Sequence, residues 1–314
     1  MKFAILFPGQ GSQSTGMLSG LAAKYPVIDE TFREAGEVLG FDLSSLVREG
    51  PAEALNRTEN TQPMLLAAGV AVWRALQIGE SAPIAGLAGH SLGEYTALVC
   101  AGALDFSDGL KLVRARGLYM QEAVPEGQGA MAAILGLDDE TIRGICRDLN
   151  TQTHVVEAVN FNAPGQVVIA GEASAVEQAM SGCKEAGAKL AKKLAVSVPS
   201  HCALMRPAAR RLESMLNDTA IHAPRLPVFH NVDAVPRSEP ADIRAALVRQ
   251  LYSPVLWVDT INALNARGAE VFLECGPGKV LAGLNKRIRR DIESIALQDV
   301  SGLSTARTRL EEAA

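Results

Sequence analysis

The chain has 314 residues, of which 48% are hydrophobic and only 4% aromatic, and its formal net charge is −5. This apolar content excludes a disordered chain, and the absence of a glycine period excludes a collagen-like one. The negative charge argues against a nucleic-acid-binding protein. The length allows one large domain or two modest ones, and many aliphatic and small residues favour a layered α/β fold.

The five cysteines, at positions 100, 146, 183, 202 and 275, contain no CxxC pair. This spacing is typical of reduced thiols and predicts neither a disulfide framework nor a zinc site. The apolar segments Phe3–Phe7 and Pro63–Trp73 are too short for a signal peptide core and a membrane span, respectively. We therefore expect a soluble, cytoplasmic protein without membrane contact.

Two short apolar runs in the first third of the chain are each followed by a glycine-containing loop. Phe3–Phe7 predicts a buried strand that ends at Pro8-Gly9, and Pro83–Ala88 predicts a second strand that ends at Gly89–Gly93. Apolar periodicity predicts helices around residues 15–40 and 62–78, from Glu94 to Ala101, and from about Ser107 to Ala123.

The segment 124–197 shows the order β-α-β-β-α-β, which is typical of a ferredoxin-like subdomain. The expected elements are Ala130–Leu135, a helix from Asp138 to about Leu149, Val155–Asn160, Gln166–Ala170, helix Ala173–Ala186 and Lys189–Val198. We interpret it as an insertion into a domain made of residues 1–123 and 198–314. After it, helix and strand alternate again in Ala203–Leu216, Leu226–Phe229, Ile243–Leu251 and Val271–Glu274.

The strongest local motif is Gly89–Gly93, which reads GHSLG. It fits the G-x-S-x-G nucleophile elbow and has the strand before it and the helix after it that this motif requires. A sharp turn there would expose the Ser91 hydroxyl at a helix N-terminus, where the N–H of Leu92 can face a developing oxyanion. The alternative is a glycine-rich turn with an ordinary serine.

A nucleophilic serine needs a base, and the chain has five histidines. His201 and His230 both follow strand-like runs, where an α/β fold places its active-site loops, and His201 also lies where the insertion rejoins the main domain. The side chain of His90 should point away from that of Ser91. Position alone favours His201 but leaves His230 open, and each could be a structural histidine.

Arg116 lies on the apolar stripe of the helix predicted from Ser107, whereas Arg114 lies on a neighbouring face. A guanidinium in this position either extends to water or meets a buried anion.

Two glycine loops lack the features of phosphate-binding motifs. Gly9–Gln13 has no third glycine, and Gly276–Lys279 lacks the Walker spacing and its Ser/Thr. The first loop could still supply main-chain N–H donors. The chain has no HExxH motif or Cys/His cluster, so no metal site is predicted. Basic residues cluster at 189–193, 206–211 and 286–290, where a solvated face is the simplest interpretation.

Several motifs in order along nearly the whole chain resemble the malonyl-CoA:acyl carrier protein transacylase family of bacterial fatty acid synthesis. These motifs are Phe7–Gln13, Gly89–Tyr95, Arg116-Gly117, Met120–Ala123, Asn160–Gln166, Ser197–His201, Gln250–Val255 and Glu274–Gly278.

The resemblance implies an α/β-hydrolase-like large domain with a ferredoxin-like insertion. It implies Ser91 as nucleophile and His201 as base, with the main-chain carbonyl of Gln250 supporting the histidine in place of a carboxylate. The main-chain N–H groups of Gln10 and Leu92 would form the oxyanion hole. Arg116 would bind the malonyl carboxylate.

The resemblance also implies partners and an activity. The substrates would be malonyl-CoA and acyl carrier protein bearing phosphopantetheine, with no metal or redox cofactor, no nucleic acid and no membrane, and we expect a monomer. Basic residues among Lys189/Lys193 and Lys286/Arg287 would dock the acidic carrier protein. A serine hydrolase or thioesterase, and a non-catalytic module that binds acyl-CoA or carrier protein, are the alternatives.

Overall fold

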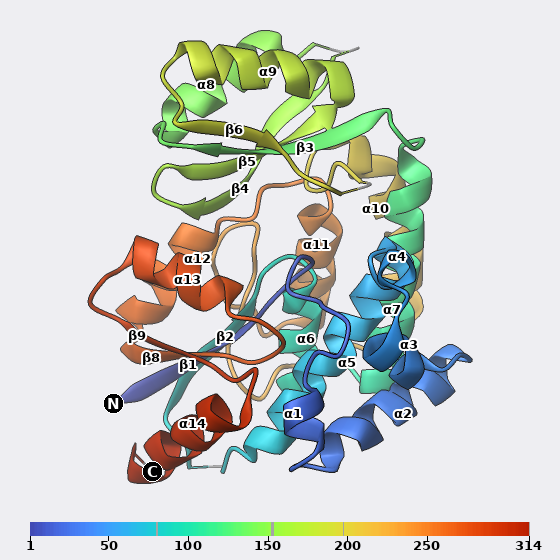
Figure 1. The fold of residues 1–314 in the computed structure, drawn as a ribbon, viewed down its shortest axis with the longest axis vertical. Helices are drawn as coiled ribbons and strands as arrows, with labels where there is room; N and C mark the ends of the chain where they lie inside the picture. Colours follow the sequence, from blue (N-terminus) through green and yellow to red (C-terminus); the bar gives the residue numbers. More distant parts are fainter. Residues whose placement is uncertain (80, 152–153, 197, 314) are drawn as a thin grey trace.

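The computed structural model describes residues 1–79, 81–151, 154–196 and 198–313. These residues form two separate sheets with helices packed around them (Figure 1). One sheet is parallel and the other antiparallel, so the predicted mixed α/β fold with a second, smaller sheet is confirmed. Ser197, one end of a motif and of the predicted insertion, lies outside the described residues.

The larger sheet has five strands in the order β7-β2-β1-β8-β9, and every neighbouring pair is parallel. The strands are β1 (Lys2–Phe7), β2 (Ile84–Gly89), β7 (Val228–Phe229), β8 (Ala269–Glu274) and β9 (Glu293–Ala296). Strands β1 and β2 lie side by side and run in the same direction. Their carboxyl ends therefore bring the loop after Phe7 next to the loop after Gly89.

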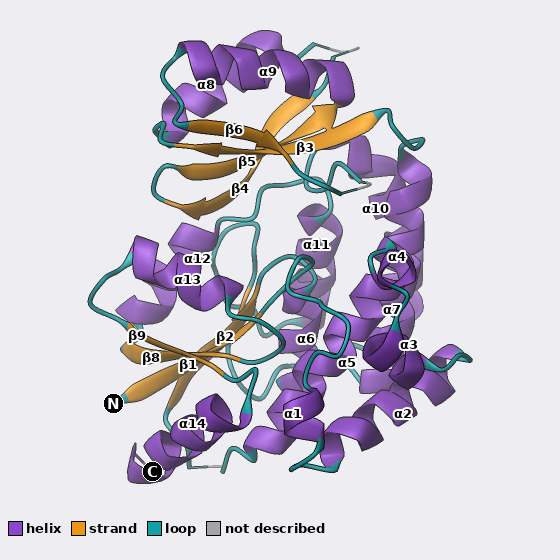
Figure 2. Ribbon diagram, in the orientation of Figure 1, coloured by secondary structure: helices purple, strands orange, loops and turns teal. Residues whose placement is uncertain are grey.

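Strand β1 is buried on both faces, which explains its unbroken apolar run. Phe3, Ile5 and Phe7 join the core on one side of the sheet, and Ala4 and Leu6 join the core on the other. All five side chains are fully buried. Helices α12 (Trp257–Ala266) and α13 (Val280–Ile288) cover the second side, and α14 (Val300–Ala313) lies across the first (Figure 2).

The helices predicted around the parallel sheet are present, with differences at their ends. The structure adds helices that the sequence did not predict, namely the two short ones at Leu43–Glu49 and Ala52–Leu55 and the three from α12 to α14. In chain order the helices are α1 (Ser19–Ala22), α2 (Val27–Leu39), α3 (Leu43–Glu49), α4 (Ala52–Leu55), α5 (Thr58–Leu76), α6 (Gly93–Cys100), α7 (Phe106–Ala123), α10 (Arg206–Asp218), α11 (Pro240–Gln250), α12 (Trp257–Ala266), α13 (Val280–Ile288) and α14 (Val300–Ala313). A 3₁₀ turn, Ala203–Met205, precedes α10. The helical region expected at 15–40 is two helices, because Pro26 stands between them and lacks the N–H that a continuing helix would need.

The smaller sheet has the antiparallel order β4-β5-β3-β6. Its elements are β3 (Gly129–Leu135), α8 (Asp139–Leu149), β4 (Val156–Ala163), β5 (Gln166–Glu172), α9 (Ala173–Glu185) and β6 (Leu190–Lys193), in the predicted sequence. Helices α8 and α9 cover one face (Figure 1). All these elements lie within 124–197, the segment that we propose as the inserted subdomain.

Strand β6 is shorter than the strand predicted for Lys189–Val198. It pairs with β3 only from Leu190 to Lys193, and the chain then leaves the sheet. Leu194 and Val196 instead line a cavity, so their apolar character serves that cavity and not a strand.

The face of the smaller sheet opposite α8 and α9 turns toward the rest of the molecule. Met131, Val159 and Val168 pack there with Cys202, which follows the small sheet in the chain. The main chain of β4 also forms a bridge between Asn160 and Val255. The two sheets are thus joined by packing, and residues of both line the cavity described below. Among the described residues, no helix is long and apolar enough to cross a membrane.

Candidate active site

Ser91 lies in the tight turn between β2 and α6, as predicted. Its φ angle is 52°, a conformation that a non-glycine residue rarely adopts. Two glycines make the turn possible, because the chain passes very close to itself. A Cβ atom on Gly89 would lie 1.8 Å from the carbonyl carbon of Gly93, and one on Gly93 would lie 2.0 Å from the Phe7 oxygen.

The Ser91 hydroxyl contacts the ring of His201. The distance from Ser91 Oγ to His201 Nε2 is 2.7 Å, and His201 Nδ1 lies 2.7 Å from the main-chain oxygen of Gln250. A carbonyl only accepts hydrogen bonds, so Nδ1 carries the proton and Nε2 is left to accept one from Ser91. The geometry is that of a serine–base pair oriented by a third group.

His201 is only 2% exposed. Burial, and then the positive charge of Arg116, lower the pKa of His201 to about 3. The ring is therefore neutral near pH 7 and can accept a proton.

The other histidines do not compete for this position. His230, the alternative left open by the sequence, is fully buried and its Nδ1 lies 2.7 Å from Glu94 Oε1. The His90 ring is directed to Asn162, with 2.8 Å from Nε2 to Oδ1. His154 is near Glu172 in the smaller sheet, and His222 donates its main-chain N–H to Ala103.

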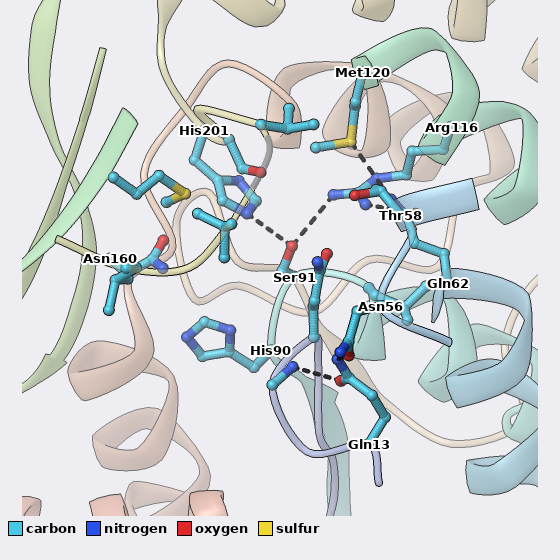
Figure 3. A pocket seen from close by; sticks show the side chains of 18 of the residues that line it. Gln13, Asn56, Thr58, Gln62, His90, Ser91, Arg116, Met120, Asn160 and His201 are labelled. Atoms are coloured by element: carbon cyan, nitrogen blue, oxygen red, sulfur yellow. Dashed lines mark hydrogen bonds between the residues drawn. The ribbon is translucent and has the colours of Figure 1, made fainter. Parts of the chain in front are cut away.

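Arg116 is buried, which excludes the alternative that its guanidinium extends to water. Its side chain, 1% exposed, points from α7 toward Ser91. Nη1 donates to Gln62 Oε1 at 2.8 Å, and Nη2 donates to Ser91 Oγ at 3.2 Å and Gln250 Oε1 at 3.1 Å. Figure 3 shows the Ser91 hydroxyl between the His201 ring and the Arg116 guanidinium. Among the described residues, Nε of Arg116 has no hydrogen-bond partner.

A cavity of about 280 Å³ opens over these side chains. Gln10, Leu92 and Arg116 line it from the side of the parallel sheet, and Met131 and Asn160 line it from the smaller sheet. Gln10 follows β1 and Leu92 follows Ser91, so the adjacent carboxyl ends of β1 and β2 bring both residues close to the Ser91 hydroxyl.

Two polar residues that the sequence did not single out complete the site. Asn231 accepts a hydrogen bond from the Ser91 main-chain N–H at 2.7 Å, and its side-chain amide donates to the Gly89 oxygen at 2.7 Å. It thereby ties the two ends of the strained turn together. Gln62 holds one arm of Arg116. Asn231 directly follows the candidate His230 after a strand-like run, and this position could have pointed to it. Gln62 lies in an apolar helix, and nothing in the sequence around it indicates a role in the site.

Among the described residues, no group of three or more His, Cys, Asp or Glu side chains is placed to hold a metal ion. All five cysteines are buried and unpaired, as expected for reduced thiols.

The fold and this serine-based site define an acyltransferase. The sequence matches the acyl transferase domain family over residues 4–306. The chain belongs to the malonyl CoA-acyl carrier protein transacylases within that family. The relative from Haemophilus influenzae is 56% identical over 96% of this chain and 97% of its own, and the one from Escherichia coli K12 is 55% identical over 97% and 98%.

Solved structures agree with this assignment. An acyl carrier protein S-malonyltransferase from Vibrio cholerae is 57% identical, covers 97% of this chain and 99% of its own, and has a TM-score of 0.94. A malonyl-transacylase in complex with a type II PKS acyl-carrier protein is 52% identical, covers 98% and 100%, and has a TM-score of 0.96.

Proposed function

We propose that this protein transfers the malonyl group from malonyl-CoA to the phosphopantetheine thiol of acyl carrier protein through a malonyl-Ser91 intermediate. The position of the Ser91 hydroxyl carries the proposal, because it lies 2.7 Å from a neutral histidine and 3.2 Å from a buried guanidinium. A single CH₂ group separates the carboxylate of malonate from its thioester carbonyl. An enzyme for this substrate therefore needs its cation directly beside the nucleophile.

In the first half-reaction, His201 Nε2 takes the Ser91 proton while Oγ attacks the thioester carbonyl. The main-chain N–H groups of Gln10 and Leu92 stabilise the oxyanion. The carbon–sulfur bond then breaks, and protonated His201 returns the proton to the departing CoA sulfur. Malonyl-Ser91 remains, with its carboxylate paired to Arg116, whose planar fork favours such a bidentate contact.

In the second half-reaction, the pantetheine thiol gives its proton to His201 and attacks the Ser91 ester. The ester bond breaks, the malonyl thioester forms, and Ser91 recovers the proton. His201 thus acts as base and acid in turn, oriented throughout by the carbonyl of Gln250. We further propose that the protein works as a cytoplasmic monomer and that these steps require no cofactor.

The fate of the isolated acyl-enzyme tests this proposal. Malonyl-enzyme, freed of excess malonyl-CoA, should persist in buffer and discharge within seconds when acyl carrier protein bearing phosphopantetheine is added. Carrier protein without the prosthetic group is the control and should leave it intact. Loss to water at the same rate in all three samples would instead indicate a thioesterase.

A further inference from the structure

Glu94 is a buried charge that the steps above do not use. It lies on α6 just after the nucleophile turn and is 0% exposed. Its Oε1 is paired with His230 Nδ1 at 2.7 Å, and its Oε2 accepts from the Asn231 main-chain N–H and from Gln250 Nε2, each at 2.9 Å. A buried carboxylate with three hydrogen-bond partners is held in one position.

Gln250 connects this carboxylate to each catalytic group. Its side-chain Nε2 donates to Glu94 and to the main-chain oxygen of Ser91, and its Oε1 accepts from Arg116. Its main-chain oxygen accepts from His201. The Gln250 amide therefore lies between a buried cation and a buried anion, with its oxygen toward the cation and its N–H toward the anion.

This arrangement addresses an electrostatic difficulty of the site. Arg116 is buried, and its partners Gln62, Ser91 and Gln250 are all neutral. Burial lowers the pKa of Arg116, and the negative charge of Glu94 is among the factors that oppose this. A direct ion pair would occupy the guanidinium that the substrate needs. Glu94 lies on the other side of the Gln250 amide, so it balances the charge of Arg116 and leaves the guanidinium open toward the cavity.

Among the described residues, His201 is hydrogen-bonded to Ser91 and to the Gln250 carbonyl and to no acidic side chain. Arg116 disfavours a positive charge on the histidine, yet the histidine must become positive when it takes the Ser91 proton. A fixed anion behind Gln250 offsets part of that repulsion.

We propose that Glu94 is a positioning residue for acyl transfer, which acts through Gln250 to balance Arg116 and to support the protonation of His201. This inference rests on the proposed function. Glu94 touches neither substrate nor Ser91 Oγ, so its effect falls on the chemical step. Removing its charge should even strengthen the attraction of Arg116 for the malonyl carboxylate.

Glu94→Gln tests the charge at nearly constant shape. The new amide oxygen can accept from Asn231 and Gln250, and the new amide N–H can donate to His230 if its proton moves to Nε2, which has no partner among the described residues. Glu274→Gln is the matched control, because Glu274 is also buried and its carboxylate accepts hydrogen bonds from the main-chain N–H groups of Leu281 and Ala282.

The readouts are the maximal rate of Ser91 malonylation in a quenched single turnover and the malonyl-CoA concentration that gives half that rate. We expect Glu94→Gln to lower the maximal rate at least about tenfold, the effect of one pKa unit on a catalytic group. The half-saturating concentration should stay the same or fall. Glu274→Gln should keep the wild-type maximal rate. An unchanged maximal rate in Glu94→Gln, or a rise in its half-saturating concentration, would overturn the proposal.

A second variant covers the case in which Glu94→Gln does not fold. Gln250→Met keeps the carbonyl that binds His201 but breaks the amide link to Glu94. Its maximal rate should fall by a similar factor, and the double variant should be no slower than the slower single one. A double variant whose loss of rate is the product of the two single losses would contradict action through Gln250. So would an unchanged rate in Gln250→Met alone. If wild-type protein is not malonylated at Ser91, the proposed function fails; if it is and the variants match it, only this inference fails.

Discussion

The His201 ring is held in its neutral form by its surroundings. It is almost fully buried and lies next to the positive charge of Arg116, and its pKa is lowered to about 3. An unfolded chain binds a proton at this residue below pH 6.5, whereas the folded protein does so only near pH 3. His201 therefore costs no stability above pH 6.5, and it lowers stability progressively as the pH falls toward 3.

This pKa predicts an unusual pH dependence for Ser91 acylation. The second-order rate constant of malonylation should be nearly constant from pH 7.5 to pH 5.5, because the base stays neutral over that range. It should be measured by quenched mass spectrometry, with circular dichroism confirming that the fold persists. A fall of about tenfold by pH 5.5 would indicate an ordinary histidine with a pKa near 6.5 and would contradict this account.

Arg116 is predicted to select for the substrate carboxylate. Arg116→Ala should lower malonyl-CoA turnover by roughly 30- to 5,000-fold, since truncating one partner of a buried charge pair costs about 2–5 kcal/mol. Activity on acetyl-CoA should rise relative to malonyl-CoA. Arg114→Ala is the control, because Arg114 lies on the same helix but donates to the Leu39 oxygen. An equal loss on both substrates would remove the proposed role.

The residues of the site differ in how far the sequence could predict them. The GHSLG motif with its flanks pointed to Ser91, because the turn is encoded locally. His201 and His230 could not be separated by position, since both follow apolar runs, and only the fold shows that His230 is paired with Glu94 behind the turn. The family resemblance supplied the roles of Gln250, Gln10 and Arg116. Gln250 and Gln10 would act through a main-chain carbonyl and a main-chain N–H, which leave no trace in residue type. The position of Arg116 on an apolar stripe did not identify the anion that it would bind.

At the level of elements, the nucleophile turn depends on close contact between α6 and β1. Strand β1 ends at Phe7, and the first residue of α6 passes directly against the Phe7 oxygen. This contact aligns the N-terminus of the helix with the loop that holds Gln10.

Gly93→Ala should therefore destabilise the protein by at least about 3 kcal/mol and abolish Ser91 acylation, because the added methyl group overlaps main-chain atoms. Thermal or urea unfolding and the malonylation assay measure both effects. Gly283→Ala, on α13, is the control, since nothing lies within 4 Å of its added Cβ. That change should leave stability the same or raise it by up to about 1 kcal/mol. Similar behaviour of the two variants would show that the contact is not required.

Helices and strands could be predicted from the sequence where apolar residues form a continuous run or repeat regularly. Strands β1 and β2 and helix α7 are buried or regular enough to be predicted within one or two residues. Helices α12 to α14 and strand β9 were not predicted, because each of them buries few side chains and therefore carries a weak apolar pattern. The strand expected up to Val198 ends at Lys193, since the apolar residues beyond it line the cavity.

At the scale of the whole molecule, the cavity between the two sheets is the place where both substrates must meet Ser91. Exposed basic residues stand on β6 and near it (Lys189, Lys193) and at the end of α13 (Lys286, Arg287). Arg287 also donates to Gln166 at the start of β5. Both pairs are the proposed contacts for an acidic carrier protein.

Charge reversal tests this surface. Lys189→Glu with Lys193→Glu, or Lys286→Glu with Arg287→Glu, should raise the KM for acyl carrier protein and flatten its dependence on salt. The KM for malonyl-CoA serves as an internal comparison. Arg33→Glu on α2 changes an exposed charge outside these clusters and should have no effect. Unchanged values at both clusters would place docking elsewhere on the molecule.

The covalent intermediate is the central claim, and its mass tests that claim most directly. Wild-type protein incubated with malonyl-CoA should gain the mass of one malonyl group, and peptide mapping should place the adduct on Ser91. Ser91→Ala should gain no mass under the same conditions. A wild-type protein that stays unmodified while it turns over malonyl-CoA, or an adduct mapped to any other residue, would contradict the account.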